Sequence, residues 1–300
     1  MIRHRISHTT QYRYSEPVTL CHNETHLFPR SLATQRCVDA GIQISPKPKV
    51  YHERKDFFGN RVVYFSIEQS HTDLEVTARS EVELSPLPPP ALEDTPLWED
   101  VRARLRQEVS RNVLEARQFV LDSSFINACA AFAQYATPSF TSGRPFLSAV
   151  QDLMRRIFTE FTYDSDSTTV ATPVHEVFVH KHGVCQDFAH FAIACLRSLG
   201  FAARYVSGYL ETRPPEGKTQ LVGTAASHAW VSVYCPELGW VDFDPTNNLL
   251  PSGHHIVVAW GRDYSDVAPL KGTILGGVQH ELNVKVEVTR VEEREPLPTR

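Results

Sequence analysis

The sequence predicts an α+β protein in which an antiparallel β-sandwich module at the N-terminus precedes a larger unit of helices and strands. Three observations carry this prediction. Segments that alternate apolar and polar residues fill residues 1 to about 85, a proline-rich run interrupts them at Pro86–Pro90, and an apolar helix that begins near Cys185 is followed by strand-like segments. A helix followed by a run of strands is typical of α+β folds and not of a βαβ repeat.

Length and composition fit two compact units of an ordinary globular protein. The chain has 300 residues and a net charge of −5 with histidines neutral, and its basic residues are scattered. This charge pattern gives no reason to expect binding to nucleic acid or to an anionic membrane. No apolar run approaches the ~20 residues that span a bilayer, and no apolar h-region follows the charged N-terminus. We therefore expect a soluble, cytoplasmic protein.

The N-terminal module, expected over residues 1–88, is predicted from strand-like patterns. Arg61–Ile67 is rich in β-branched and aromatic residues, and Leu74–Ala78 and Val82–Leu84 alternate apolar with polar residues. Such segments are typical of strands with one buried face. Phe58–Asn60 contains glycine and asparagine and fits a turn between two of them.

The proline-rich run at Pro86–Pro90 marks the expected domain boundary. It favours an extended polyproline conformation and cannot continue a sheet. We expect the second domain to span residues 91–300, with a helical segment over 91–182 and the Cys185 helix with an antiparallel sheet over 183–300.

Three helices are predicted in the helical segment from apolar residues at helical spacing. They cover Trp98 to Val109, Phe125 to Tyr135 and Leu147 to Phe158. Ser123 and Ser124 are available as N-caps for the second.

A further helix is predicted to begin at or near Cys185. Gly183 is a natural stop for the short helix before it, Phe188 and Leu199 belong to its apolar stripe, and Gly200 ends it. Unpaired backbone N–H groups and the positive end of the helix dipole gather at such an N-terminus. They favour the thiolate form of a cysteine at this position, and the N–H groups could stabilise an oxyanion. Cys185 is therefore a candidate nucleophile, whereas Cys195 in mid-helix fits the core.

The candidate base must come from another element. His190 lies five residues after Cys185, about 140° around the helix at ~100° per residue. The strand predicted at Ser227–Tyr234 instead carries His228 and Trp230 on one face, since side chains alternate. We therefore take His228 as the candidate base.

A carboxylate is expected beside His228. Residues 235–239 fit a hairpin turn, and a symmetric loop would place Asp244 opposite His228, with Cβ atoms ~5 Å apart. A bulge at Gly239 would shift the register and bring in Asp242 instead. Spacing alone therefore leaves both carboxylates open as partners of the histidine.

Metal-site patterns are incomplete, so we expect no metal and no cofactor. His175 and His180 are one residue too far apart for the zinc motif HExxH, and Asp164–Asp166 lacks the later ligands of a calcium loop. The cysteines show no CxxC pair, so neither a zinc knuckle nor a disulfide framework is expected. A zinc hydrolase that uses His180, His182 and Cys185 remains an alternative.

Three ordered blocks resemble those of bacterial transglutaminase-like proteins, a family of cysteine-protease type. The blocks are Gly183–His190, Ser227–Val231 and Gly239–Asn247. In that family the cysteine, the histidine and the aspartate before proline form a papain-like triad. The resemblance thus implies a papain-like transglutaminase core and a triad of Cys185, His228 and Asp244.

The resemblance extends to most of the chain. Residues 1 to about 85 resemble the family's β-rich N-terminal domain, and Gly261–Pro269 resembles its C-terminal block. Arg262 in that block could bind a substrate carboxylate with its fork, and Tyr264 could pack against the acyl chain. In the alternative interpretation, Arg262 pairs with Asp263 or Asp266 in a structural turn.

The expected function is amide-bond chemistry through a thioester acyl-enzyme on a peptide or protein substrate. Tyr163 or Trp230 could assist the backbone N–H groups in holding the oxyanion. We expect hydrolysis, by a peptidase or amidase. A cross-linking transglutaminase and a non-catalytic peptide-binding module are the alternatives.

Overall fold

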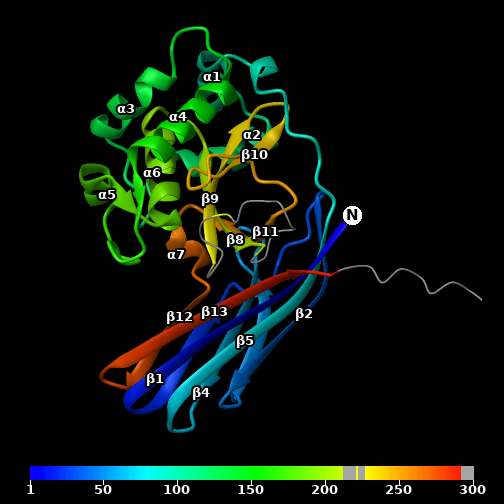
Figure 1. Cartoon of the computed structure of the whole chain (residues 1–300), viewed down its shortest axis with the longest axis vertical. Coiled ribbons are helices and arrows are strands. Elements are labelled where there is room, and N and C mark those ends of the chain that lie inside the picture. The colour runs from blue at the N-terminus through cyan, green and yellow to red at the C-terminus, as the bar shows by residue number, and fades with distance from the viewer. Residues whose placement is uncertain (212–220, 222–226, 292–300) are drawn as a thin grey trace, which may run out of the picture.

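Two large β-sheets and a group of helices dominate this computed structural model, which describes residues 1–211, 221 and 227–291. A seven-stranded antiparallel sheet lies at one end of the molecule, and a four-stranded sheet with the helices lies at the other (Figure 1). The fold is α+β with an N-terminal antiparallel sheet, as predicted.

The seven-stranded sheet is organised around its first strand. Its main path is β2-β5-β1-β4-β3, and β12 and β13 also pair with β1. The strands are β1 (Ile2–Thr25), β2 (Gln35–Ser45), β3 (Val50–Lys55), β4 (Arg61–Ile67), β5 (His71–Leu84), β12 (Leu270–Gly276) and β13 (His280–Arg290). The strand predicted at 61–67 is confirmed, and the two predicted at 74–78 and 82–84 are parts of β5.

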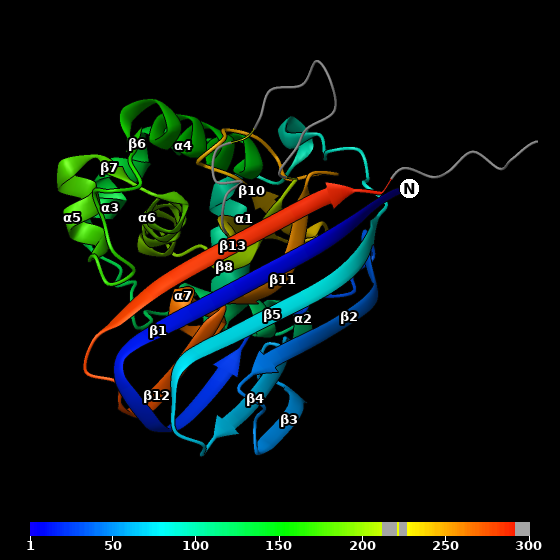
Figure 2. The same cartoon turned by 60° about the horizontal axis from the view of Figure 1, so that its bottom comes forward.

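The two halves of β1 belong to two packed layers of this sheet (Figure 2). Residues Ile2–Arg13 pair with β5, and Cys21–Thr25 pair with β4, with a register irregularity between the halves. Apolar side chains from both layers, among them Val18, Phe65 and Leu74, meet in one buried cluster. The predicted sandwich therefore arises because one long strand bends back over its own sheet.

The last two strands return to the N-terminal sheet, and this differs from the expectation that residues 91–300 form one domain. β13 pairs with residues His4–Tyr14, and β12 pairs with residues between Val18 and Thr25. Both halves of β1 thus gain a second neighbour from the far end of the chain. The proline-rich run ends the first segment of the module, but residues 270–290 complete it.

The second part of the molecule contains the helices and the four-stranded sheet. The helices are α1 (Trp98–Gln107), α2 (Arg111–Arg117), α3 (Ala130–Ala136), α4 (Phe146–Glu160), α5 (Val174–His180), α6 (Cys185–Ser198) and α7 (Tyr264–Val267), with short 3₁₀ turns at Leu92–Asp94, Gln118–Val120 and Thr137–Ser139. The sheet has the order β10-β9-β8-β11, with β8 (Ala203–Leu210), β9 (His228–Cys235), β10 (Gly239–Phe243) and β11 (His255–Gly261). A short parallel pair joins β6 (Thr162–Tyr163) to β7 (His182–Gly183). No helix in the described part of the chain is long and apolar enough to cross a membrane.

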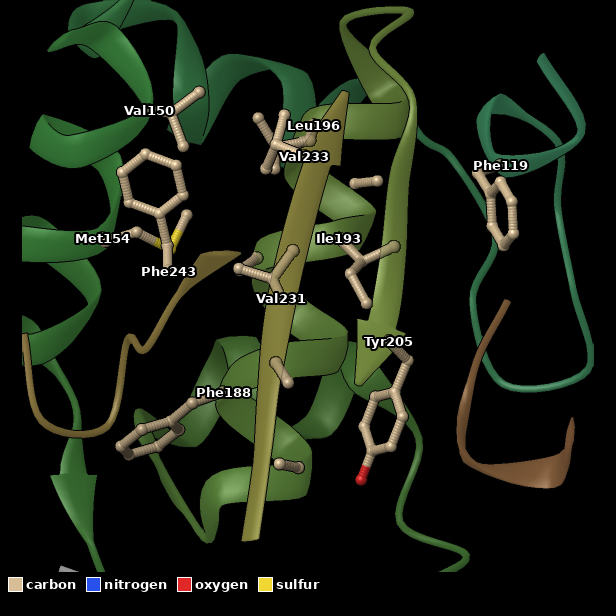
Figure 3. Packing of buried hydrophobic residues seen from close by; sticks show 14 of the residues in the cluster. Phe119, Val150, Met154, Phe188, Ile193, Leu196, Tyr205, Val231, Val233 and Phe243 are labelled. Carbon is tan, nitrogen blue, oxygen red and sulfur yellow. The ribbon is translucent and has the colours of Figure 1, made fainter. Parts of the chain in front are cut away.

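Helix α6 is the centre of this part. Its Ile193 and Leu196 lie against Val231 and Val233 of β9 (Figure 3), and all four side chains are fully buried. Because side chains alternate along a strand, Trp230 lies on the opposite face of β9, in a separate cluster with Val206. The helix is thereby fixed against one face of the sheet, with its first residue near the start of β9.

The second predicted helix is shorter than expected. The pattern predicted a helix over Phe125–Tyr135, but α3 begins at Ala130. The Phe125 N–H donates instead to Asp263 Oδ2 at 2.8 Å, and its ring stacks on His190. A tertiary contact thus replaces the first helical turn, which the local spacing of apolar residues does not reveal.

Two side-chain amides of the N-terminal module cover the edge strand β11. Gln35 donates to the Val257 carbonyl at 2.7 Å and accepts from its N–H at 2.8 Å. Asn60 does the same at Trp260, with distances of 2.8 and 3.0 Å. Each amide satisfies the free backbone groups of one residue, as a neighbouring strand would, and so joins the two parts of the molecule.

Candidate active site

The thiol of Cys185 lies at the first residue of α6, where a side-chain cap fixes the backbone. Asp187 Oδ2 accepts from the Val184 N–H at 2.8 Å and from the Thr168 hydroxyl at 2.6 Å. Gly183 leaves room for this carboxylate, since a Cβ there would lie 2.6 Å from Asp187 Oδ2. The capped first turn therefore holds the thiol and the neighbouring backbone N–H groups in place.

The other cysteines do not share this environment. All six are free thiols. Cys195 is fully buried in mid-α6, and burial raises the pKa of its thiol well above the usual value. This confirms its interpretation as a core residue.

His228 begins β9 and is hydrogen-bonded to Asp244, which follows β10. The Nε2–H of His228 donates to Asp244 Oδ2 at 2.9 Å, and both side chains are fully buried. Its Nδ1 has no hydrogen-bond partner in the described part of the chain. The charge of Cys185 raises the pKa of His228, which places the thiol near this ring.

The electrostatics of the site favour a charged imidazole. Burial lowers the pKa of His228, but Asp244 and then Cys185 raise it, with a net pKa of about 10. Burial also works against a charged Asp244, yet His228 and His255 hold the pKa of this carboxyl well below its usual range. The geometry thus holds an imidazolium beside a carboxylate at neutral pH.

Asp244 is held by hydrogen-bond donors on all sides. Its Oδ1 accepts from the backbone N–H groups of Thr246 and Asn247 at 2.9 and 3.1 Å. Its Oδ2 also accepts from Asn247 Nδ2 at 2.8 Å and from His255 Nε2 at 3.0 Å. Sequence reasoning missed both side chains. Asn247 lies within a block that was singled out, but no local pattern distinguishes His255.

The hairpin register differs from the symmetric one that was expected. Trp240 pairs with Tyr234 and Asp242 pairs with Ser232, so the pairing is shifted by two residues. The backbone of Asp244 is not paired with β9, and it lies in a turn that Leu249 closes through a β-bridge. The carboxylate therefore reaches His228 from beyond the strand end and not from across the ladder.

Asp242 and Trp230 form a pair of their own. The Trp230 indole N–H donates to Asp242 Oδ2 at 3.0 Å, and the indole is fully buried, stacked near His228 at 6.1 Å between ring centroids. The expected contact of Trp230 with substrate does not fit this placement, because its only polar group is already bonded. The indole instead supports the histidine.

The predicted substrate residues have different environments. Tyr163 is 38% exposed, and its pKa, raised to about 12 chiefly by burial, also responds to Cys185. Arg262 donates from Nε and Nη2 to Asp266, each at 2.9 Å. This is the ion pair expected if Gly261–Pro269 forms a structural turn. Tyr264 is half-buried with its ring edge-on to Tyr205, 6.4 Å between centroids. Tyr163 is therefore partly exposed near the thiol, whereas the Arg262 guanidinium is already bonded to Asp266.

Tyr205 is a further residue near the thiol that sequence reasoning missed. Burial raises its pKa well above the usual value, and the nearby charge of Cys185 adds to this effect. It lies on β8, on the face that packs against α6. Only the packing of α6 on the sheet brings it to the site.

The ligand atoms of His228, Asp244 and His255 lie within 4.8 Å of one another, which is a spacing that could hold a metal ion. In this structure both Nε2–H groups donate to the same carboxylate oxygen. Hydrogen bonds are therefore sufficient to account for the arrangement.

Two family profiles match the chain in the order that the fold displays. The bacterial transglutaminase-like N-terminal region matches residues 4–83, and the transglutaminase-like superfamily matches residues 133–245. The second match includes Cys185, His228 and Asp244. The chain therefore belongs to the transglutaminase-like family and carries its bacterial N-terminal region.

The chain is also similar to individual proteins. An uncharacterised protein of Mycobacterium tuberculosis strain H37Rv is 42% identical over 302 residues, which cover 97% of this chain and 93% of the relative. A protein-glutamine gamma-glutamyltransferase of Pseudomonas aeruginosa is 34% identical over 99 residues, 31% of this chain and 15% of that protein. The crystal structure of a "Putative Cysteine Protease" from Cytophaga hutchinsonii shares the fold, with a TM-score of 0.75 and 22% identity over 98% of this chain and 92% of that one.

Proposed function

We propose that this protein is a cysteine-dependent enzyme that cleaves amide bonds through a thioester acyl-enzyme, as a peptidase or amidase. The observation that carries the proposal is the position of His228, with Asp244 on Nε2 at 2.9 Å and the Cys185 thiol beside the ring. A nucleophile, a base and a group that orients the base are the parts that this chemistry needs.

The reaction would proceed in two steps. The Cys185 thiolate attacks the amide carbonyl, and His228 donates its proton to the departing amine, which leaves a thioester on the enzyme. His228 then takes a proton from water, and the resulting hydroxide attacks the thioester and releases the carboxylic acid, which restores the Cys185 thiolate beside a protonated His228. Asp244 keeps the imidazole oriented throughout.

Backbone N–H groups in the first turn of α6 would hold the oxyanion of both tetrahedral intermediates. They have no carbonyl partner within the helix, and the positive end of the helix dipole adds to their effect. The Asp187 cap fixes this turn. Tyr163 is the predicted substrate residue whose exposure and proximity to Cys185 best suit contact with a bound peptide.

Two alternatives share the same site. A cross-linking transglutaminase would transfer the acyl group to an amine in place of water, and the partial similarity to the Pseudomonas glutamyltransferase favours testing this acceptor. A non-catalytic peptide-binding module would not need an activated thiol, and the buried Asp244–His228 pair beside Cys185 argues against it.

The test combines an acceptor assay with thiol labelling. The protein is incubated with a peptide library, with and without a primary amine, and the products are followed by mass spectrometry, with Cys185→Ala as the control. We expect Cys185-dependent products that gain water even when amine is present, whereas predominant amine adducts would indicate the cross-linking activity. If limiting iodoacetamide labels another cysteine first and no product depends on Cys185, the proposal is wrong.

A further inference from the structure

A cavity of about 690 Å³ lies behind the candidate active site, on the face of the four-stranded sheet opposite to α6. Four parts of the chain line it. The edge of the N-terminal sheet contributes Gln35, the proline-rich run contributes Pro86–Pro90, the four-stranded sheet contributes Trp230, Trp240 and His255, and the segment before β11 contributes Leu250 and Ser252. Cys185 does not line it. Its volume lies in the range of cavities that hold small organic ligands, ~300–1,000 Å³.

The walls of the cavity are largely apolar, and three of the polar side chains in them are already paired. The Trp230 indole N–H donates to Asp242, both ends of the Gln35 amide bond Val257, and His255 Nε2–H donates to Asp244. Asp242 Oδ1, by contrast, accepts no hydrogen bond in the described part of the chain, so the wall offers a free acceptor to a ligand.

The charge balance favours a neutral ligand. Asp242 is the carboxylate in the wall. The Arg204 guanidinium stacks on Trp240, 4.3 Å from the ring centroid, and is close enough to Asp242 for the two charges to interact. Because this cation offsets the carboxylate, the cavity has little need of a second positive charge.

Two residues of the wall also touch the candidate triad. His255 donates to Asp244 at 3.0 Å, and Trp230 stacks near His228. A molecule that presses on either side chain therefore acts on the residues that orient and support the candidate base. The coupling between the cavity and the triad thus runs through two direct contacts and does not require a chain of intermediate residues.

We infer that this cavity is an effector site for a neutral, largely apolar molecule that carries a hydroxyl or N–H donor, and that its occupation changes the reactivity of Cys185 through His255 and Trp230. Ligand binding is independent of the proposed function, whereas its effect on the thiol rests on the proposed triad.

The test uses 4-fluorobenzyl alcohol as a probe and 4-fluorobenzyl methyl ether as a matched probe without the donor, both followed by ¹⁹F NMR. We expect saturable binding of the alcohol and about fivefold weaker binding of the ether, as for the loss of one hydrogen bond. Leu250→Trp, and separately Ser252→Trp, should fill the cavity and remove the binding, while Cys185→Ala should bind the alcohol like wild type. Absence of saturable binding, equal affinity of the two probes, or unchanged binding in both Trp variants would overturn the site.

A second measurement tests the coupling. The rate constant for alkylation of Cys185 by iodoacetamide is measured with and without saturating alcohol. We expect a change of about twofold or more in wild type and none in either Trp variant. If the alcohol binds and Cys185 is alkylated, but the rate constant is the same with and without the alcohol, the coupling is wrong. An unreactive Cys185 with intact binding would instead refute the proposed function and leave the ligand site standing.

Discussion

At the scale of single residues, the clearest distinction is between the two carboxylates of the Gly239–Asn247 block. Asp244 accepts from His228, whereas Asp242 accepts from Trp230. Replacing Asp244 by Asn removes the charge that raises the pKa of His228 and weakens the hydrogen bond that orients its ring beside Cys185. We therefore expect Asp244→Asn to slow iodoacetamide alkylation of Cys185 at neutral pH about tenfold or more.

Asp242→Asn is the matched control, because Asn can still accept from the Trp230 indole. It should alkylate at nearly the wild-type rate, with both variants checked for folding by circular dichroism. Equal rates for Asp244→Asn and wild type would contradict the role assigned to Asp244.

The protonation of His228 should also make the free energy of unfolding depend on pH. Its pKa is about 10 in the folded protein against ~6.5 in an unfolded chain. A raised pKa means that folding binds a proton, so this stabilisation is complete below ~6.5 and is lost as the pH rises through about 10. The difference in unfolding free energy between wild type and His228→Asn should therefore shrink from pH 7 to pH 10. Urea unfolding of both proteins at matched pH measures it, and a constant or growing difference would count against the shift.

At the scale of elements, the start of α6 depends on one carboxylate. Asp187 caps the Val184 N–H, and the loss of an N-terminal cap costs about 1 kcal/mol. Asp187→Ala should lower the unfolding free energy by roughly that amount and also slow alkylation of Cys185, since the first turn loosens.

Gly183→Ala tests the same cap without removing it, because the new Cβ would meet Asp187 Oδ2 at 2.6 Å. Asp187→Ala and Gly183→Ala should both lower the free energy of unfolding, measured with urea, and slow the alkylation of Cys185, measured by labelling kinetics. A variant that loses stability but keeps the alkylation rate would show that the cap does not position the thiol.

At the scale of the whole molecule, the N-terminal module needs the end of the chain. β12 and β13 pair along both halves of β1. A fragment of residues 1–88 leaves β1 without these partners, and unpaired edges favour aggregation. We expect this fragment to be unfolded or insoluble, and a fusion of residues 1–88 through a flexible linker to residues 269–291 to fold cooperatively.

Circular dichroism and urea unfolding of the two polypeptides distinguish these outcomes. A fragment of residues 1–88 that unfolds cooperatively by itself would support the simpler division at the proline-rich run, with β12 and β13 as dispensable additions.

The sequence by itself determined the α+β class, the strands of the N-terminal module, and the helix that starts at Cys185, because these depend on local periodicity and on caps. It also provided His228 and Asp244 as partners, since the chain blocks that contain them resemble a family. It misplaced the hairpin register, because a shift of two residues leaves every side chain on the same face and changes no local pattern.

Only the tertiary structure decided the rest. His255 reaches Asp244 because β11 returns beside β8, and Tyr205 approaches the thiol because α6 packs on that face of the sheet. The structure also decided that Trp230 bonds Asp242 and that Arg262 bonds Asp266, as in the alternative interpretation of its block. β12 and β13 pair with β1 across more than two hundred residues, and no local pattern encodes which edge a late strand will join.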